Sequence, residues 1–209
     1  EDITFHELNS DYIATYDLFQ KTEAGLCRNT IVRYMKCFKR ITNMALAKEW
    51  MRKDPFYGYK MAQDETDPVF LTYPELKSIM EKEFTIPRLA LVRDIFVFAA
   101  FTGLAFANVS TLTKDNLVQD NNGDWWIRKG RVKLERRHRA SSVCNIPLLP
   151  VPLAILKKYE EHPICRKKSL CLPVICNQRM NSYLKEIADL CNIRKNLTTH
   201  TAKHSKIYI

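Results

Sequence analysis

The chain has 209 residues, of which 46% are apolar, which is enough to bury a core in one large or two modest domains and argues against disorder. Its net charge of +10 and pI near 9.3 favour a polyanionic partner, because Lys and Arg displace counterions from phosphates; a basic protein without such a partner is the plainer alternative. Neither a membrane-length apolar run nor a signal-peptide pattern occurs, so we expect no membrane association.

Charge is unevenly distributed along the chain. Residues 1–67 contain 10 Lys and Arg against 11 Asp and Glu, a net charge of −1. The chain totals of 33 and 23 leave 23 basic and 12 acidic residues for 68–209, a net charge of +11. This asymmetry predicts two functional units, with the second making most of the electrostatic contact. The polar segment 58–68 has no periodic pattern and predicts the linker, with the boundary near Asp67.

Cysteine and histidine spacing gives no disulfide or metal motif. The seven cysteines are odd in number and form no C-x-x-C pair, which indicates unpaired thiols in a reducing cytoplasm. His200 and His204 stand at i, i+4, a spacing that can ligate a metal, but no third ligand accompanies them in an H-E-x-x-H pattern. No glycine-rich nucleotide loop occurs either. We therefore expect no metal, no cofactor and no small-molecule substrate.

Two amphipathic helices are predicted in the first unit. Asn9 or Ser10 can cap the first helix, and Gly25 lies just beyond its end. Its apolar face comprises Tyr12, Ile13, Tyr16 and Phe19. The second helix begins at Asn29, and its apolar face comprises Ile31, Tyr34, Met35, Phe38, Ile41 and Ala45. The opposite face suits either DNA contact or plain solvation, and it carries Arg33, Lys36, Lys39 and Arg40.

Helices are also predicted throughout the second unit. Thr72-x-x-Glu75 forms a capping box with Pro74 in the first turn, so a helix begins there. Residues 87–101 are apolar almost all round and predict the central buried helix, which Thr102-Gly103 ends. Other helices are expected over 107–112, from Pro150 through Tyr159, over 177–191 and from Thr198 or Thr199. The helix over 177–191 has an apolar face of Met180, Tyr183, Leu184, Ile187 and Leu190.

A strand pair interrupts these helices. The turn residues 120–123 precede a strand over 125–128, and residues 143–148 form its partner. The predicted fold class is therefore mainly α with a small antiparallel sheet, an α+β architecture. The segment around the hairpin is strongly basic, and a single acid, Glu135, stands among Arg128, Lys129, Arg131, Lys133, Arg136, Arg137 and Arg139. An anion should bind there.

In their order and spacing, several stretches resemble the tyrosine recombinase (phage integrase) family over nearly the whole chain. Residues 21–56 resemble the helical core-binding domain of that family. Four stretches of the second unit resemble the catalytic domain of that family. They are FTGLAFANVSTLT at 101–113, the strand pair leading into IPLLP, NSYLKEIADLCNI and LTTHTAKH. The resemblance implies a core-binding domain over 1–67, a catalytic domain over 68–209, duplex DNA as the partner and a homo-tetramer on that DNA.

The same resemblance implies strand breakage without metal, in which a tyrosine attacks a phosphodiester and forms a 3′-phosphotyrosine. Fixed cations stabilise the five-coordinate phosphate in such a reaction. Lys133 matches the hairpin lysine that protonates the leaving oxygen, or is one more cation on the DNA backbone. His200 matches the first residue of the family's H-x-x-R motif, or is an ordinary histidine at a helix start.

The sequence departs from the family pattern at catalytic positions. Ala105 follows Thr-Gly-Leu where the family carries its first arginine, although some mobile-element integrases resemble this form. Lys203 replaces the second arginine, which keeps the charge and loses the planar fork. Tyr208 follows Lys203 too closely to match the nucleophile, so we expect a fragment that lacks the nucleophile and cannot cleave.

The leading hypothesis is a site-specific DNA recombinase, an integrase of a mobile element, that makes most of its contacts to phosphates. The alternative is a non-catalytic DNA-binding protein derived from the same fold, in which Ala105 and Lys203 are evolved losses. A third possibility is a basic scaffold for protein or RNA, which would show no preference for duplex DNA.

Overall fold

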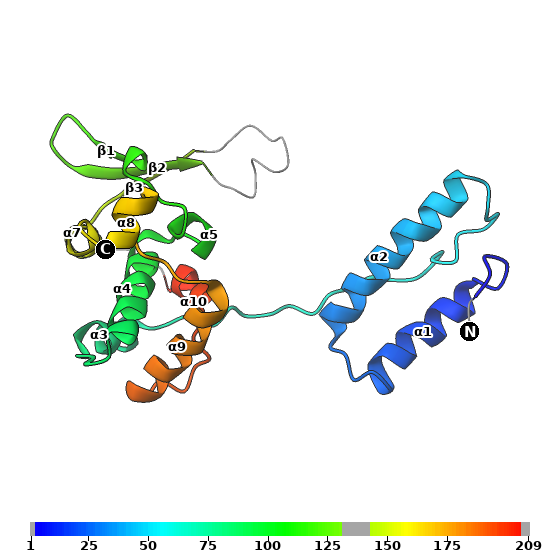
Figure 1. Ribbon diagram of the computed structural model, residues 1–209. Helices are drawn as coiled ribbons and strands as arrows, with labels where there is room; N and C mark the ends of the chain where they lie inside the picture. The colour runs from blue at the N-terminus through cyan, green and yellow to red at the C-terminus, as the bar shows by residue number, and fades with distance from the viewer. Residues whose placement is uncertain (1–2, 131–142, 206–209) are drawn as a thin grey trace. The chain divides into compact units, whose positions relative to one another are not determined.

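The computed structural model describes residues 3–130 and 143–205, and the chain divides into unit 1 (Glu1–Asp67) and unit 2 (Pro68–Ile209) (Figure 1). Each unit contains its own clusters of buried apolar side chains. Within the described part of the chain, no helix is both long enough and apolar enough to cross a membrane.

Unit 1 contains the two helices that the sequence predicts, α1 (Ser10–Thr22) and α2 (Arg28–Ala47). Asn9 caps α1, because its side-chain oxygen accepts a 2.9 Å hydrogen bond from the amide of Tyr12. Gly25 follows the helix with a φ of +60°, a left-handed conformation that favours glycine. The core of unit 1 packs Ile13, Ile31, Met35 and Phe56 together.

Parts of the predicted apolar faces in unit 1 are exposed, which corrects the sequence prediction. The side chains of Phe19, Tyr34 and Ile41 are 52%, 45% and 52% exposed. The neighbouring buried positions are Gln20, Val32 and Thr42. Packing against the other helix and the loop after α2 selects the buried face, which overlaps the predicted apolar stripe and is rotated slightly away from it.

The first part of the expected linker is tied to the start of α2. The Arg28 guanidinium donates hydrogen bonds to the carbonyl oxygens of Lys60 at 3.1 Å and Ala62 at 3.2 Å. Asn29 and Asp64 exchange two hydrogen bonds, one to and one from the backbone of Asp64, at 3.0 and 2.9 Å. These bonds hold residues 60–64 against the start of α2.

Unit 2 is built around α4 (Pro87–Thr102), the central buried helix that the sequence predicts. Gly103 ends it with a φ of +67°. The predicted capping box is present at the start of α3 (Tyr73–Glu81), where the Glu75 carboxylate accepts a 2.7 Å hydrogen bond from the amide of Thr72. The other helices as they occur are α5 (Phe106–Val109), α7 (Pro150–Tyr159), α8 (Pro163–Lys168), α9 (Asn177–Leu190) and α10 (Thr199–His204).

Three features of these helices differ from the prediction. The helix expected over 107–112 is the shorter α5, because Thr113 already caps the 3-10 turn η1 (Lys114–Asn116). The sequence pattern missed α8, which is 6 residues long and too short for a periodic signal. Leu190, expected on the apolar face of α9, is 45% exposed, whereas Ala188 is buried.

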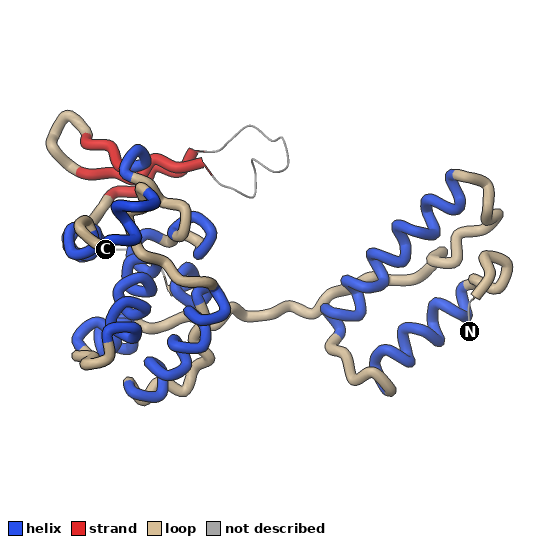
Figure 2. Tube along the Cα trace, viewed as in Figure 1, coloured by secondary structure: helices blue, strands red, loops and turns tan. Residues whose placement is uncertain are grey.

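The described strands form an antiparallel sheet in the order β1 (Leu117–Gln119), β2 (Trp125–Gly130) and β3 (Val143–Pro147) (Figure 2). The predicted pair is β2 and β3, with Ile127 opposite Ile146. The sequence missed β1, whose 3 residues pair Leu117 with Ile127. The sheet lies at one end of the helical part of unit 2, and the buried Ile127 joins it to the core (Figure 1). The mainly α class with a small antiparallel sheet is confirmed.

Candidate functional site

Two of the three predicted catalytic residues lie on α10, a helix of 6 residues. Thr198 caps it, since its hydroxyl accepts a hydrogen bond from the amide of Thr201 at 3.3 Å. Thr201 and Ala202 are buried against the core. The positions on the other side of the helix are exposed, and these are His200, Lys203 and His204. The short helix thus presents a basic, imidazole-bearing face to the solvent.

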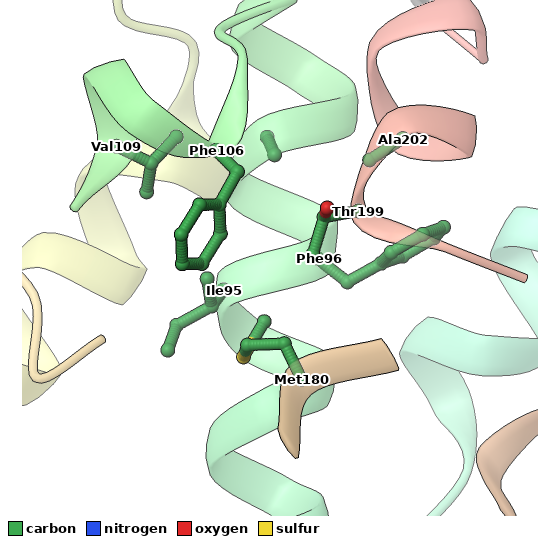
Figure 3. A pocket seen from close by; sticks show the side chains of 8 residues that line it. Ile95, Phe96, Phe106, Val109, Met180, Thr199 and Ala202 are labelled. Atoms are coloured by element: carbon green, nitrogen blue, oxygen red, sulfur yellow. The ribbon is translucent and has the colours of Figure 1, made fainter. Parts of the chain in front are cut away.

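An apolar seam between four helices holds α10 in place (Figure 3). The residues that line this seam are Ile95, Phe96, Ala99, Phe106, Val109, Met180, Thr199 and Ala202. They enclose about 10 Å³, room for about one water molecule, so the seam is a packing interface and not a ligand site. Because Phe106 directly follows Ala105, the same seam positions both Ala105 and α10.

Polar side chains hold the beginning of α10. Asn181 accepts a 2.9 Å hydrogen bond from the amide of Thr199, and Asn177 accepts a 2.8 Å hydrogen bond from the hydroxyl of Thr199. Both asparagines belong to α9. No sequence pattern points to them, because an asparagine in a helical pattern gives no signal about the distant group that it bonds.

A second anchor for this region lies between α3 and the loop before α10. Lys195 donates a 2.7 Å hydrogen bond to the Glu75 carboxylate, which also accepts from the amide and the hydroxyl of Thr72. Burial acts to raise the pKa of Glu75, but the hydrogen bonds from Lys195 and Thr72 outweigh it, and the pKa lies below its usual value. Glu75 is therefore held as a carboxylate that joins two segments distant in the sequence.

The sequence resemblance assigns the family's first arginine to position 105, which holds an uncharged alanine. Ala105 is the N-cap residue of α5 and makes no side-chain cap hydrogen bond. It follows Leu104, which is buried, and its own side chain is half-buried. A side chain that reaches out from position 105 would therefore begin at the edge of the seam that also holds α10.

The basic hairpin is described only in part. Arg128 is exposed on β2. Lys129 is not a simple surface cation, because its ammonium donates hydrogen bonds to the carbonyl of Thr111 and to the side-chain oxygen of Asn116. These bonds connect β2 to the α5–η1 segment. The remaining predicted hairpin residues lie outside the described residues, and they are Arg131, Lys133, Arg136, Arg137 and Arg139.

The basic residues predicted on α2 have different surroundings. Arg33 and Arg40 are exposed. Lys36 is exposed and donates a 3.1 Å hydrogen bond to the side-chain oxygen of Gln63. Lys39 is half-buried, with its ammonium 5.7 Å from the centre of the Phe56 ring. Lys39 therefore contributes to the core of unit 1, and the outward basic face consists mainly of the other three residues.

The two histidines of α10 contact each other. Their Nε2 atoms are 2.9 Å apart, and the ring centres are separated by 4.4 Å with an angle of 83° between the planes. Among residues 3–130 and 143–205, no group of three or more His, Cys, Asp or Glu side chains could hold a metal ion. The pair consequently has at most two protein ligands to offer within the described chain.

Comparison with known proteins gives a sequence match within unit 1 and structural matches over nearly the whole chain. Residues 1–61 match the sequence profile of the phage integrase SAM-like domain. No curated protein matches the chain as a sequence. Among solved structures, the chain is similar to a lambda integrase dimer bound to a COC′ core site, with a TM-score of 0.74 and 12% identity, covering 97% of this chain and 71% of that chain.

Other site-specific recombinases show the same likeness. The Tn1549 transposon integrase in complex with circular intermediate DNA has a TM-score of 0.68 and 17% identity, covering 95% of this chain and 71% of that one. The XerH recombinase bound to a palindromic difH substrate has a TM-score of 0.66 and 16% identity over 96% of this chain. The chain spans 60% of the length of that XerH chain. Residues 1–61 therefore match the phage integrase SAM-like domain in sequence, and the chain shares the fold of these recombinase and integrase structures, as the sequence resemblance implied.

Proposed function

We propose that this chain is part of a site-specific DNA recombinase, an integrase of a mobile element, that binds duplex DNA and breaks and rejoins strands through a phosphotyrosine intermediate. The observation that carries the proposal is one chain that joins a phage integrase SAM-like domain to a unit whose α10 presents His200 and Lys203 on an exposed face. In this proposal residues 1–67 are the core-binding domain and residues 68–209 the catalytic domain. The free thiols of the described cysteines suit the expected cytoplasmic compartment.

Charge supports DNA as the partner. Unit 2 carries 23 basic against 12 acidic residues, a net charge of +11. Such a surface gains affinity when it releases counterions from phosphates. Arg128 and the basic residues that follow it in the hairpin supply the largest local charge, and the exposed Arg33, Lys36 and Arg40 on α2 supply a second basic surface. Lambda integrase, Tn1549 integrase and XerH were each solved in complex with DNA, which supports the same partner here.

The chemistry follows from two side chains on one helix face. His200 and Lys203 are one turn apart and both point away from the buried Thr201 and Ala202. Together they can hold the non-bridging oxygens of a phosphate, and Lys133 is the proposed donor of the proton to the leaving oxygen. We assign the nucleophile to none of the described residues. No metal is required, because the cations come from side chains.

Salt dependence tests the DNA contact. Changing Arg136, Arg137 and Arg139 to Gln together should flatten the slope of log affinity against log salt by about 2.7, because each lost phosphate contact removes about 0.9. A matched control changes Arg166, Lys167 and Lys168 to Gln, which alters net charge equally at the end of α8. If both triple variants change the slope equally, general charge and not the hairpin binds the DNA.

Phosphate recognition by α10 is tested by restoring the arginine fork. Lys203→Arg should tighten binding to duplex DNA several-fold, since a guanidinium offers a bidentate contact where an ammonium offers a point charge. Ala105→Arg adds the other missing cation beside the same seam. If neither change affects DNA affinity at low salt, α10 does not face a phosphate.

Covalent trapping tests the strand-breaking step. A nicked suicide duplex incubated with the protein from the complete reading frame should yield a protein–DNA adduct that a Tyr→Phe change at the attacking residue abolishes. Duplex binding without any adduct would favour the second candidate, a non-catalytic DNA-binding protein, for which the uncharged Ala105 is the supporting observation. Equal competition by RNA would instead favour a basic scaffold.

Assembly on DNA is part of the proposal. A lambda integrase tetramer bound to a Holliday junction is similar to this chain with a TM-score of 0.73 and 12% identity, covering 97% of this chain. We propose a homo-tetramer on DNA for the whole protein. Analytical ultracentrifugation with a four-way junction should show four protein copies per junction, and a complex with one or two copies would contradict it.

A further inference from the structure

The paired histidines of α10 have a geometry that ordinary exposed histidines lack. The Nε2 atoms of His200 and His204 approach to 2.9 Å, and the rings stand nearly perpendicular, at 83°. A neutral imidazole has one nitrogen that donates and one that accepts. In this contact one ring donates and the other accepts, and the two Nε2 atoms lie side by side at the surface of α10.

We propose that His200 and His204 form a binding site for a divalent first-row transition metal ion of the Ni²⁺ or Cu²⁺ type. The ion replaces the hydrogen bond between the rings: it lies to one side of the line between the two nitrogens, and each ring turns so that its Nε2 lone pair points at the ion. Both neutral rings then carry their proton on Nδ1, so the step is a change of tautomer in one ring and needs no net loss of protons. Imidazole nitrogen is a preferred ligand for these ions.

The distance between the two nitrogens selects the coordination geometry. Ligands about 2.1 Å from an ion and at right angles to each other lie about 3.0 Å apart, whereas a tetrahedral angle places them about 3.4 Å apart. The observed 2.9 Å fits the right-angled arrangement of tetragonal and octahedral ions. Tetrahedral Zn²⁺ would require the two rings to move apart by about half an ångström. The site should therefore favour Ni²⁺ and Cu²⁺ over Zn²⁺.

Beyond the two imidazoles, the described residues leave the remaining coordination positions to water. The described residues hold no group of three or more His, Cys, Asp or Glu side chains that could hold a metal. His200 and His204 are exposed, so an ion can reach them without any rearrangement of the core. The expected site is an exchangeable one that bridges a single turn of α10 and is not a structural metal centre.

The metal site has a consequence that rests on the proposed function. Nε2 of His200 cannot ligate a metal and contact a DNA phosphate at the same time. Ni²⁺ should therefore weaken the contact of α10 with DNA, although Lys203 on the same face keeps its charge. Binding of the metal itself depends only on the two histidines and holds whether or not the chain binds DNA.

The test uses the full chain without an affinity tag and NiCl₂ as the probe, followed by isothermal titration calorimetry. Ni²⁺ avoids the oxidation of the exposed thiols of Cys27, Cys37 and Cys176 that Cu²⁺ would cause. Wild type should bind one ion per chain, and His200→Ala and His204→Ala should each weaken it by about tenfold or more, because the second imidazole acts at a high effective concentration. His6→Ala, an exposed histidine of unit 1, is the matched control and should bind as wild type does.

Two further readouts separate this inference from the proposed function. Far-UV circular dichroism and urea midpoints equal to wild type show that the variants are folded, and a visible absorption band of bound Ni²⁺ should disappear in both α10 variants. Equal Ni²⁺ affinity in wild type and both variants would overturn the site. Retained Ni²⁺ binding without any effect on DNA affinity would support the metal site and contradict the placement of His200 at a phosphate.

Discussion

The backbone amide of Leu71 donates a 2.7 Å hydrogen bond to the hydroxyl oxygen of Ser205. The bond is buried, and the same hydroxyl donates to the carbonyl of Thr201 at 2.8 Å. Leu71 is where the linker reaches the core of unit 2, and Ser205 is the C-cap residue of α10. The junction with the linker and the helix that carries the candidate site residues are thus in direct contact.

Removing this hydroxyl should destabilise unit 2. Ser205→Ala leaves the amide of Leu71 buried without its partner, which should lower the free energy of unfolding by about 1–3 kcal/mol. Urea unfolding followed by circular dichroism measures the change. Ser182→Ala, an exposed position on α9, should change the same quantity by less than about 0.5 kcal/mol. An equal cost for both variants would mean that the Leu71–Ser205 bond contributes nothing specific.

The ion pair between Glu75 and Lys195 makes the stability of unit 2 dependent on acid pH. Because the pKa of Glu75 is lowered in the folded protein, its contribution is complete above the unfolded pKa of about 4.3 and is lost as the pH falls through the folded pKa. Glu75→Gln can keep the capping box, since glutamine also serves at that position, but it loses the charge that pairs with Lys195, so it should lower the free energy of unfolding by about 1 kcal/mol near neutral pH. The difference from wild type should shrink steadily below about pH 4.

The control for this pH dependence is Glu81→Gln. Glu81 is an exposed partner of Lys77 at 3.6 Å on the same helix, and its removal should change stability by a few tenths of a kcal/mol at most. Urea unfolding at a series of pH values compares the variants. A difference between wild type and Glu75→Gln that stays constant from neutral to acid pH would contradict the role of the carboxylate.

The guanidinium of Arg28 should protect the segment after the core of unit 1 from local opening. Arg28→Lys keeps the charge but cannot donate to both the Lys60 and Ala62 carbonyls, so hydrogen exchange at the Asp64 amide should become about tenfold faster. Exchange followed by mass spectrometry measures this. Arg33→Lys, on the exposed face of α2, should leave it unchanged. Similar acceleration in both variants would show that Arg28 is not the anchor.

A buried carboxylate joins α4 to α7. Asp94 accepts hydrogen bonds from Arg93 at 2.8 Å, Lys158 at 2.7 Å and the hydroxyl of Tyr159 at 2.8 Å. Asp94→Ala should cost about 3 kcal/mol, because it leaves the buried Tyr159 hydroxyl and the part-buried Arg93 without their acceptor, whereas Tyr159→Phe should cost about 1 kcal/mol. Burial and the bond to Asp94 raise the pKa of Tyr159, so in a spectrophotometric titration it should lose its proton above the usual range for tyrosine. Equal costs for the two variants would contradict this assignment.

Short-range sequence patterns are enough to locate most of the helices. The capping box at Thr72, the apolar run of α4 and the left-handed glycine after it are short-range features, because each depends on residues within a few positions of one another. The order of the motifs also indicated the recombinase fold, which the match over residues 1–61 and the similar structures confirm. The i, i+4 spacing of His200 and His204 predicted that both lie on one face of a helix, and both are on α10.

Packing between segments that are distant in the sequence selects which parts of those helices are buried and which residues hold the candidate site. Phe19 and Ile41 fit an apolar pattern and are exposed, because only packing against a neighbouring helix selects the buried stripe. Leu71 and Ser205 are separated by 134 positions, so no local signal could connect them. Periodicity put the two histidines one turn apart, but the 2.9 Å between their nitrogens depends on side-chain rotamers that a sequence pattern does not contain.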